Sequence, residues 1–420
     1  MKINRVLFIL LFCFYTFVAF GQIATIDETN VSQIRQRTFD RVWNIVNERH
    51  FDPTFGGVDW GKVRESYKSP AMSAKTNEEF HAVLNQMLGE LNQSHFSIYT
   101  QASESELTKC NDGIIGAEVK FLDTKVVINR IETNSPSEKA GLKMGFEIVK
   151  INNREIAEIL LPVETSFTGR KLSENLKRTY RERVINRSLC GKPETNVTVE
   201  ALNKQNKAQS FSLTRVAFKG EIEKVAEGLP PFKLQFEAKR LESNIGYISF
   251  NVWLPKQANR VRDAIVSMRD TKGIIIDLRN NSGGQGNLVN TVGGALFSDR
   301  VSFGKTKTRF GGGDFWVIPQ SKIFSGKIVI LTNNGTGSTS EIFAGGMKDL
   351  GRAEIIGERT AGAVLPATIE KLPTGANFMY AIADYRTPSG ILLEGRGVEP
   401  DVEVKLTRPS LLEGRDLQLE

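Results

Sequence analysis

The sequence predicts a multidomain α/β protein with a helical N-terminal part, a β-rich middle and an α/β core at the C-terminus. Three observations support this fold class. Apolar residues recur at helical spacing up to about Leu91, short strand-like segments and turns follow, and from about Ile245 apolar strands alternate with helical patterns. At 420 residues the chain is long enough for two or three domains, each with a core of its own.

The composition excludes several classes of protein. With 40% hydrophobic residues, a quarter of the chain charged, 14 Pro and 37 Gly, the chain is neither disordered nor collagen-like. The 3 His and 3 Cys are scattered, which excludes a zinc ribbon or an iron–sulfur framework, and we predict neither a metal nor an organic cofactor. The net charge of +7 comes without a block of basic and aromatic residues, so we expect no nucleic-acid partner.

The first 21 residues have the pattern of a secretory signal peptide. Lys2 and Arg5 precede an uncharged apolar run over 6–20, which is shorter than the ~20 residues that cross a bilayer as a helix. We therefore expect an exported protein, periplasmic or extracellular, without stable membrane insertion after cleavage; an uncleaved anchor is the alternative. An oxidising compartment would allow Cys110 and Cys190 to pair, and two buried thiols are an equally good interpretation.

Residues 22–110 are expected to form a small domain of two or three helices. One apolar stripe lies within 34–46 and another within 80–88, and a Gly- and Pro-containing loop at 51–57 separates them. The helical pattern stops at 91–96, so a turn is expected there.

Residues 111–218 change to strand-like periodicity. Strands are expected over 113–119, 125–131 and 148–152, with a short helix that Ser135 caps and Pro136 opens. From Gly113 to Ile156 this stretch resembles a PDZ domain in the circularly permuted form found within tail-specific proteases. A charged helical insertion follows over 161–192, and strands at 197–202 and 210–213 return to the sheet.

The PDZ resemblance implies a way to bind substrate. Such domains add an extended chain end as a strand and hold its carboxylate with main-chain N–H groups of a Gly-containing loop. That loop would consist of Gly113, Ile115, Gly116 and Ala117. A simple β-turn is the alternative interpretation of the same residues.

Residues 219–420 are expected to form the α/β core. Segments 246–250, 273–277 and 327–331 are rich in Ile and Val without polar alternation, as strands buried on both faces are. Helical patterns lie between them at 256–268 and 286–297. This order predicts a largely parallel sheet.

Ser338 is the candidate nucleophile of this core. It follows a buried strand and a Gly-rich turn, which places its hydroxyl at the carboxyl end of the sheet beside a helix N-terminus. The N–H of Thr339 and that of Gly283 or Gly284 could bind an oxyanion there. The alternative is structural, because Ser338 and Glu341 also fit a helix capping box.

Three segments, 273–284, 331–360 and 394–401, occur together with the PDZ-like stretch and resemble the tail-specific (C-terminal-processing) serine protease family. In the better-known branch of that family a Lys located 25 positions after the Ser is the base. Here that position is Ala363, and the nearest following Lys, Lys371, lies in a strand-like stretch. The sequence therefore does not support a Ser–Lys mechanism.

A second branch of the family, which resembles the catalytic core of the tricorn protease, uses His instead of Lys. Its pattern matches Ser94 and His95 at the end of the helical part, and Glu394 just before a Gly-Val-Glu-Pro-Asp stretch. The resemblance implies a tetrad in which Ser338 attacks, His95 is the base, Ser94 orients the imidazole and Glu394 anchors Ser94. A structural His at a domain junction is the alternative.

The chain is thus predicted to be an exported serine endopeptidase that cleaves unfolded or tail-exposed polypeptides and engages their chain ends with its PDZ-like domain. The other two histidines, His50 and His81, are expected to be structural or solvated. Two alternatives remain: an inactive protein that binds peptides or an apolar ligand on the same scaffold, and a hydrolase of small esters or amides. No oligomeric state is predicted.

Overall fold

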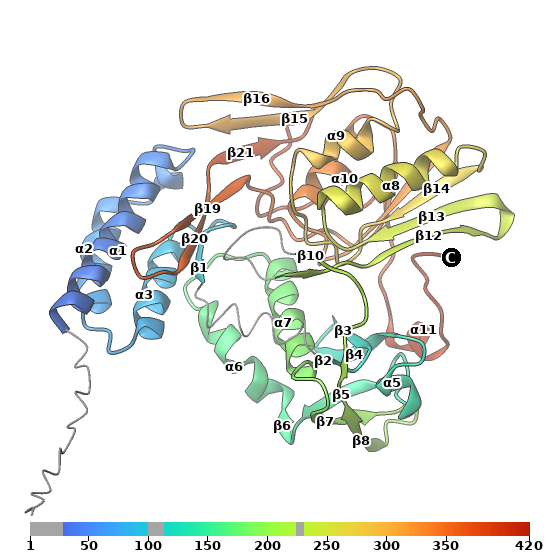
Figure 1. Ribbon diagram of the computed structural model, residues 1–420, viewed down its shortest axis with the longest axis horizontal. Coiled ribbons are helices and arrows are strands. Elements are labelled where there is room, and N and C mark those ends of the chain that lie inside the picture. The colour runs from blue at the N-terminus through green and yellow to red at the C-terminus, as the bar shows by residue number, and fades with distance from the viewer. Residues whose placement is uncertain (1–27, 100–112, 224–230) are drawn as a thin grey trace, which may run out of the picture.

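The computed structural model describes residues 28–99, 113–223 and 231–420 (Figure 1). The predicted signal segment and Cys110 lie outside these residues. Cys190 is disulfide-bonded. In the described part of the chain, no helix is both long and apolar enough to cross a membrane.

Three helices form the N-terminal part, as the apolar stripes predict: α1 (Glu28–Arg49), α2 (Trp60–Met72) and α3 (Asn77–Gly89). The side chains of Asp59 and Thr76 cap α2 and α3 by accepting main-chain N–H groups, which fixes where these helices start. A short 3-10 turn, Phe55–Gly57, lies in the loop between α1 and α2.

A hairpin from the C-terminal half completes this helical part. Strand β1 (Ser97–Tyr99) pairs with β20 (Asn377–Ala381), which pairs with β19 (Ala367–Lys371). Phe378 and Tyr380 of the hairpin are buried in the same hydrophobic cluster as the helices. Part of the segment assigned to the core by sequence therefore packs on the helical part, a contact between segments about 280 residues apart that periodicity does not reveal.

The middle of the chain forms an antiparallel sheet in the order β3-β4-β5-β7-β8. Its strands are β3 (Ala117–Leu122), β4 (Lys125–Ile131), β5 (Glu147–Ile151), β7 (Asn196–Leu202) and β8 (Ala208–Thr214), with β6 (Arg154–Glu155) beside β5. The predicted first strand is broken at Ile115–Gly116, so that β2 (Gly113–Ile114) pairs instead with β9 (Val216–Ala217).

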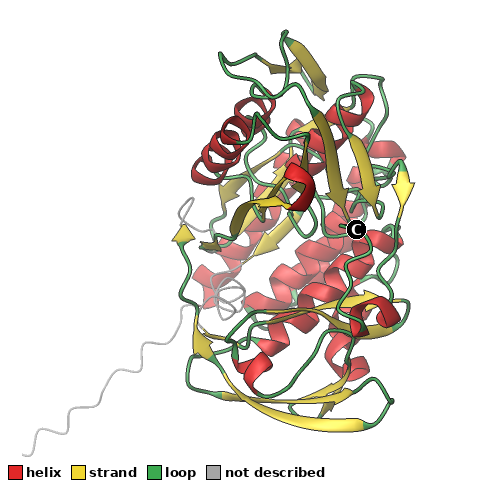
Figure 2. Ribbon diagram, turned by 90° about the vertical axis from the view of Figure 1, so that its right-hand side faces the viewer, coloured by secondary structure: helices red, strands yellow, loops and turns green. Residues whose placement is uncertain are grey.

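Three helices accompany this sheet. They are α5 (Pro136–Lys139), which Ser135 caps, α6 (Ile156–Ser166) and α7 (Glu174–Leu189). The predicted helical insertion thus consists of two helices. Helices fill much of the space between this sheet and the sheet of the core (Figure 2).

The core sheet has the strand order β12-β13-β14-β17-β18-β22. These strands are β12 (Phe236–Leu241), β13 (Ile245–Phe250), β14 (Gly273–Asp277), β17 (Lys327–Thr332), β18 (Glu354–Gly357) and β22 (Val402–Glu403). All neighbours are parallel except β12, which runs antiparallel to β13.

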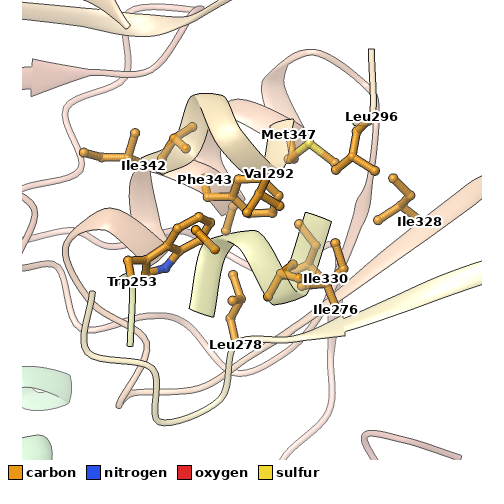
Figure 3. Packing of buried hydrophobic residues seen from close by; sticks show 14 of the residues in the cluster. Trp253, Ile276, Leu278, Val292, Leu296, Ile328, Ile330, Ile342, Phe343 and Met347 are labelled. Carbon is orange, nitrogen blue, oxygen red and sulfur yellow. The ribbon is translucent and has the colours of Figure 1, made fainter. Parts of the chain in front are cut away.

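Helices α8 (Pro255–Ser267), α9 (Leu288–Gly293) and α10 (Thr339–Asp349) pack on this sheet. Ile276 and Ile330 from the strands meet Val292 from α9, and Phe343 and Met347 from α10 (Figure 3). These side chains are almost fully buried, so the start of α10, where Ser338 lies, is held against a rigid sheet.

The remaining elements surround the core. They are β10 (Ile222–Glu223), β11 (Phe232–Lys233), β15 (Val301–Thr308), β16 (Gly311–Val317), β21 (Ala383–Arg386), α11 (Arg408–Leu412) and the 3-10 turn Glu242–Asn244. Helix α11 crosses back to the middle sheet, where Leu411 is buried against Leu122 and Val127 (Figure 1). The end of the chain therefore ties the middle sheet to the core.

Candidate active site

Ser338 lies between β17 and α10 with an unusual backbone conformation, φ 52° and ψ −120°. Such angles cost an L-residue on the order of 1–3 kcal/mol and persist only where the surroundings enforce them. The Ser338 N–H donates to the carbonyl oxygen of Ala363 (2.9 Å) and to Glu341 Oε2 (3.0 Å). The N–H of Glu341 donates to the Ser338 carbonyl oxygen at 2.8 Å, and the Ser338 hydroxyl forms no side-chain cap hydrogen bond. Ser338 and Glu341 thus form the capping box that the sequence offers as the alternative, with Glu341 accepting from Ser338 N.

Glu341 does more than close a helix end, which the sequence did not reveal. Its side chain is fully buried and accepts four hydrogen bonds. The donors are Thr360 Oγ1 (2.5 Å) and Gly362 N (2.7 Å) to Oε1, and Ala363 N (3.0 Å) and Ser338 N (3.0 Å) to Oε2. Burial raises the pKa of Glu341 to about 7 although these hydrogen bonds oppose the rise. This carboxyl group joins the nucleophile turn to the loop over 360–363.

The predicted partners Ser94, His95 and Glu394 form one hydrogen-bonded chain. Ser94 Oγ lies 2.7 Å from His95 Nδ1 and donates to Glu394 Oε2 at 2.9 Å, while Ser94 N donates to Glu394 Oε1 at 2.6 Å. Because the single hydroxyl proton goes to the carboxylate, Ser94 Oγ must accept from His95 Nδ1–H. The proton on Nδ1 leaves the Nε2 lone pair available, which is the tautomer that a general base needs.

The surroundings keep His95 neutral. Burial, together with the positive charge of Arg183, lowers the pKa of His95 to about 4. Its φ of 61° shows that the turn predicted after α3 is a tight one. Burial also raises the pKa of Glu394, against the hydrogen bonds from Val364 and Ser94.

Two adjacent residues, Ala363 and Val364, link Ser338 to the hydrogen-bonded chain of His95. Val364 N donates to Glu394 Oε2 at 3.0 Å, and the preceding residue, Ala363, accepts from Ser338 N. In the part of the chain that the structure describes, no hydrogen bond joins His95 to Ser338. Hydrogen bonds between catalytic groups are often long in resting enzymes and shorten when substrate binds.

Gly283 lies directly against the nucleophile. A Cβ atom on Gly283 would lie 2.6 Å from Ser338 Cβ and 2.9 Å from Thr339 N, so only glycine fits. Gly283 N donates to Asn281 Oδ1 at 3.1 Å, whereas the N–H groups of Gly284 and Thr339 have no acceptor among the described residues. Thr339 Oγ1 donates to the Gly284 carbonyl oxygen at 2.8 Å and holds the two peptides together. Of the predicted donors, Gly284 and Thr339 are thus the two that are available for an oxyanion.

The other candidate bases lie elsewhere. His50 is buried, with Nε2 2.9 Å from Gln93 Oε1, and His81 Nε2 lies 3.0 Å from Thr374 Oγ1. Lys371 is exposed at the end of β19. Within the described ranges, no three His, Cys, Asp or Glu side chains gather in a way that could hold a metal ion.

A large cleft of about 1110 Å³ lies between the middle sheet, α7 and the core. Of the four predicted substrate-binding residues, Ile115, Gly116 and Ala117 line it, while Gly113 pairs with β9. Ser282, which precedes the glycine turn, also lines it. The predicted substrate loop and Ser282 therefore line one cleft.

Two known protein families match parts of this chain. Residues 244–404 match peptidase family S41, and residues 33–89 match the tricorn protease C1 domain. A carboxyl-terminal-processing protease of Synechocystis sp. is 25% identical over 378 residues, which cover 88% of this chain and 81% of that protein. The chain therefore contains a peptidase family S41 domain and is similar to the tail-specific serine proteases.

Structures of this family share the fold. The photosystem II D1 C-terminal processing protease superposes with a TM-score of 0.58 at 22% identity, covering 88% of this chain and 93% of that one. The tricorn protease superposes with a TM-score of 0.51 at 19% identity, covering 93% of this chain and 36% of that one. The family matches show that this chain is a serine peptidase. They also show that it resembles the core of the tricorn protease, as predicted.

Proposed function

We propose that the chain is an exported serine endopeptidase in which Ser338 is the nucleophile and His95 the general base. The observation that carries this proposal is the position of the Ser94 hydroxyl between His95 Nδ1 and Glu394. A Ser–His pair adjacent in sequence reaches a carboxylate 300 positions away, and the hydrogen-bond directions leave Nε2 unprotonated.

The reaction follows from these positions. As Ser338 Oγ attacks a peptide carbonyl carbon, its proton passes to His95 Nε2, and the carbonyl oxygen becomes an oxyanion that the N–H groups of Gly284 and Thr339 bind. The imidazolium donates through Nδ1 to Ser94, which Glu394 holds. His95 then protonates the leaving amine, and a water molecule attacks the acyl-enzyme with His95 again as the base.

The substrate is proposed to be an unfolded polypeptide or an exposed chain end. Its chain end would be held at the loop over 113–117 of the PDZ-like domain, and the scissile bond would reach the nucleophile through the cleft that this loop shares with Ser282. Relatives such as the chloroplastic C-terminal processing peptidase of Tetradesmus obliquus are named for processing C-termini, which favours chain-end substrates.

We also propose that the protein is exported after cleavage behind residue 21. Its domains would be a helical domain over 22–110, a PDZ-like domain over 111–218 and a protease core over 219–420. The competing function is an inactive binding protein on this scaffold, which the missing hydrogen bond between His95 and Ser338 favours.

The test uses the mature protein and its Ser338→Ala variant with a chemically unfolded, fluorescently labelled protein as substrate. We expect cleavage by the wild type and none by the variant, while both have the same circular dichroism spectrum. Binding of the unfolded protein without cleavage by either form would support the inactive scaffold. Cleavage that persists in Ser338→Ala would refute the nucleophile.

A further inference from the structure

The outer edge of β3 is closed by side chains of α7. Val119 N donates to Asn186 Oδ1 (3.0 Å) and Val119 O accepts from Asn186 Nδ2 (3.1 Å), while Phe121 N donates to Glu182 Oε1 (3.0 Å). A polypeptide cannot add as a strand where the main-chain groups are already paired. A chain that enters at the loop over 113–117 is therefore directed away from β3 and into the cleft.

Arg183 projects from a different side of α7. Glu182 and Asn186 are four positions apart and face β3, whereas Arg183 is rotated about 100° from Glu182 around the helix. Arg183 is exposed and lines the cleft, as does Ser282, the neighbour of Gly283. A cation and the residue that precedes Gly283 thus line the same cleft.

The carboxylates of the cleft are already paired with cations. Each of the six lies within 4 Å of a Lys or Arg nitrogen: Glu118, Glu132, Glu182, Glu237, Asp277 and Asp416. Arg183 has no carboxylate partner among the described residues. Its guanidinium carbon lies over the ring of Tyr180, 5.8 Å from the ring centroid. Its guanidinium is open to an anionic ligand.

Arg183 also acts on the catalytic base. Its positive charge contributes, after burial, to the low pKa of His95. The carboxylates nearest the base, Glu394 and Glu341, accept hydrogen bonds from main-chain N–H groups. The cleft also has apolar lining residues, which include Phe218, Phe232 and Leu234.

We propose that Arg183 forms a carboxylate-binding subsite in the cleft, which takes an acidic side chain of an extended, otherwise apolar polypeptide. The subsite deepens the proposed protease function and rests on it. A bound carboxylate would offset the positive charge near His95 and make the imidazole a stronger base, so that acidic substrates would gain in turnover as well as in binding.

The test measures binding separately from cleavage. Four fluorescein-labelled decapeptides are titrated against Ser338→Ala by fluorescence anisotropy. They end in Leu-Glu with a free carboxylate, in Leu-Glu-amide, in Leu-Gln with a free carboxylate, or in Leu-Gln-amide. Because a charge-assisted hydrogen bond to Arg is strong, we expect Leu-Glu-amide to bind about tenfold more tightly than Leu-Gln-amide. The two single-carboxylate peptides distinguish a side-chain carboxylate from a chain end.

Two variants in α7 test whether Arg183 causes the tighter binding of the carboxylate peptides. In the Ser338→Ala protein, the further substitution Arg183→Gln should reduce the ratio of the two affinities to about one. Arg181 pairs with Glu164, and Arg181→Gln should leave the ratio unchanged. In the active enzyme, Arg183→Gln should also raise the pKa of His95, measured as the lower-pH inflection of kcat/KM for a neutral peptide. Equal binding of all four peptides, or a preference that survives Arg183→Gln, would overturn the subsite.

Cleavage of unfolded protein is scored separately. Cleavage without any charge preference would reject the subsite and leave the protease function standing. A charge preference that depends on Arg183, in a protein that cleaves nothing, would support the subsite and reject the protease function.

Discussion

Replacing Glu341 by Gln tests whether the buried carboxylate positions the nucleophile. The substitution keeps the shape but turns one of two acceptor oxygens into an NH₂ group that faces two donors. Two of the four hydrogen bonds are lost, and each buried donor left unpaired costs about 1–3 kcal/mol, so the variant should lose roughly 2–6 kcal/mol of stability. Because Ser338 N is one of the donors, the oxyanion peptide that follows it should shift.

The assay is steady-state cleavage of a quenched fluorescent peptide, together with thermal unfolding. We expect kcat to fall about 10²-fold, as for the loss of one oxyanion donor, with KM changed less than about threefold. Glu399→Gln, an exposed carboxylate, is the matched control and should change neither value. A Glu341→Gln enzyme with wild-type kcat would refute the positioning role.

The same variant has a pH signature. Because the pKa of Glu341 is raised from 4.5 to about 7, the folded protein holds a proton over this range that the unfolded chain releases. Stability should therefore fall as pH rises from about 4.5 to 7, and this slope should be absent in Glu341→Gln. Activity should have an acid limb near pH 7 in the wild type, since protonated Glu341 cannot accept all four hydrogen bonds, and this limb should be missing in Glu341→Gln.

Three further substitutions probe the rest of the site. Ser94→Ala removes the group between His95 and Glu394 and should lower kcat roughly 10²-fold while the melting temperature stays within a few degrees; an unchanged kcat would exclude Ser94 from the chain of hydrogen bonds. In Glu394→Gln the amide can donate to Ser94 Oγ, so that the hydroxyl donates to His95 Nδ1 and the imidazole carries its proton on Nε2. This tautomer cannot act as the base through Nε2, and kcat should fall about 10²–10⁴-fold. Full activity would contradict the tautomer assignment. Gly283→Ala forces its Cβ against Ser338 and should lower labelling of that serine by a fluorophosphonate at least about 10-fold, and normal labelling would show that the turn can move freely.

Local sequence signals predicted most of the elements that support the site. The Ile- and Val-rich segments became β13, β14 and β17, and Ser135 and Pro136 start α5 as expected. These features depend on neighbouring residues, whose periodicity and capping chemistry can be read directly. A resemblance to a family was needed to bring Ser94, His95 and Glu394 together.

Contacts between distant segments could not be predicted in this way. The hairpin β19–β20 packs on the N-terminal helices, and α11 packs on the middle sheet, because apolar faces find partners that no local pattern specifies. Glu341 looked like an ordinary capping residue, since the four donors that surround it come mostly from a loop 20 residues later. Arg183 looked like one charge among many on a helix of low amphipathicity.

The central claim is that Ser338 is a nucleophile activated by His95. The most direct measurement is the rate at which a fluorophosphonate labels the protein, followed by peptide mass spectrometry to locate the adduct. We expect one adduct, on Ser338, with the rate reduced at least about 10²-fold in His95→Ala. An adduct elsewhere, or an unchanged rate in His95→Ala, would contradict the claim.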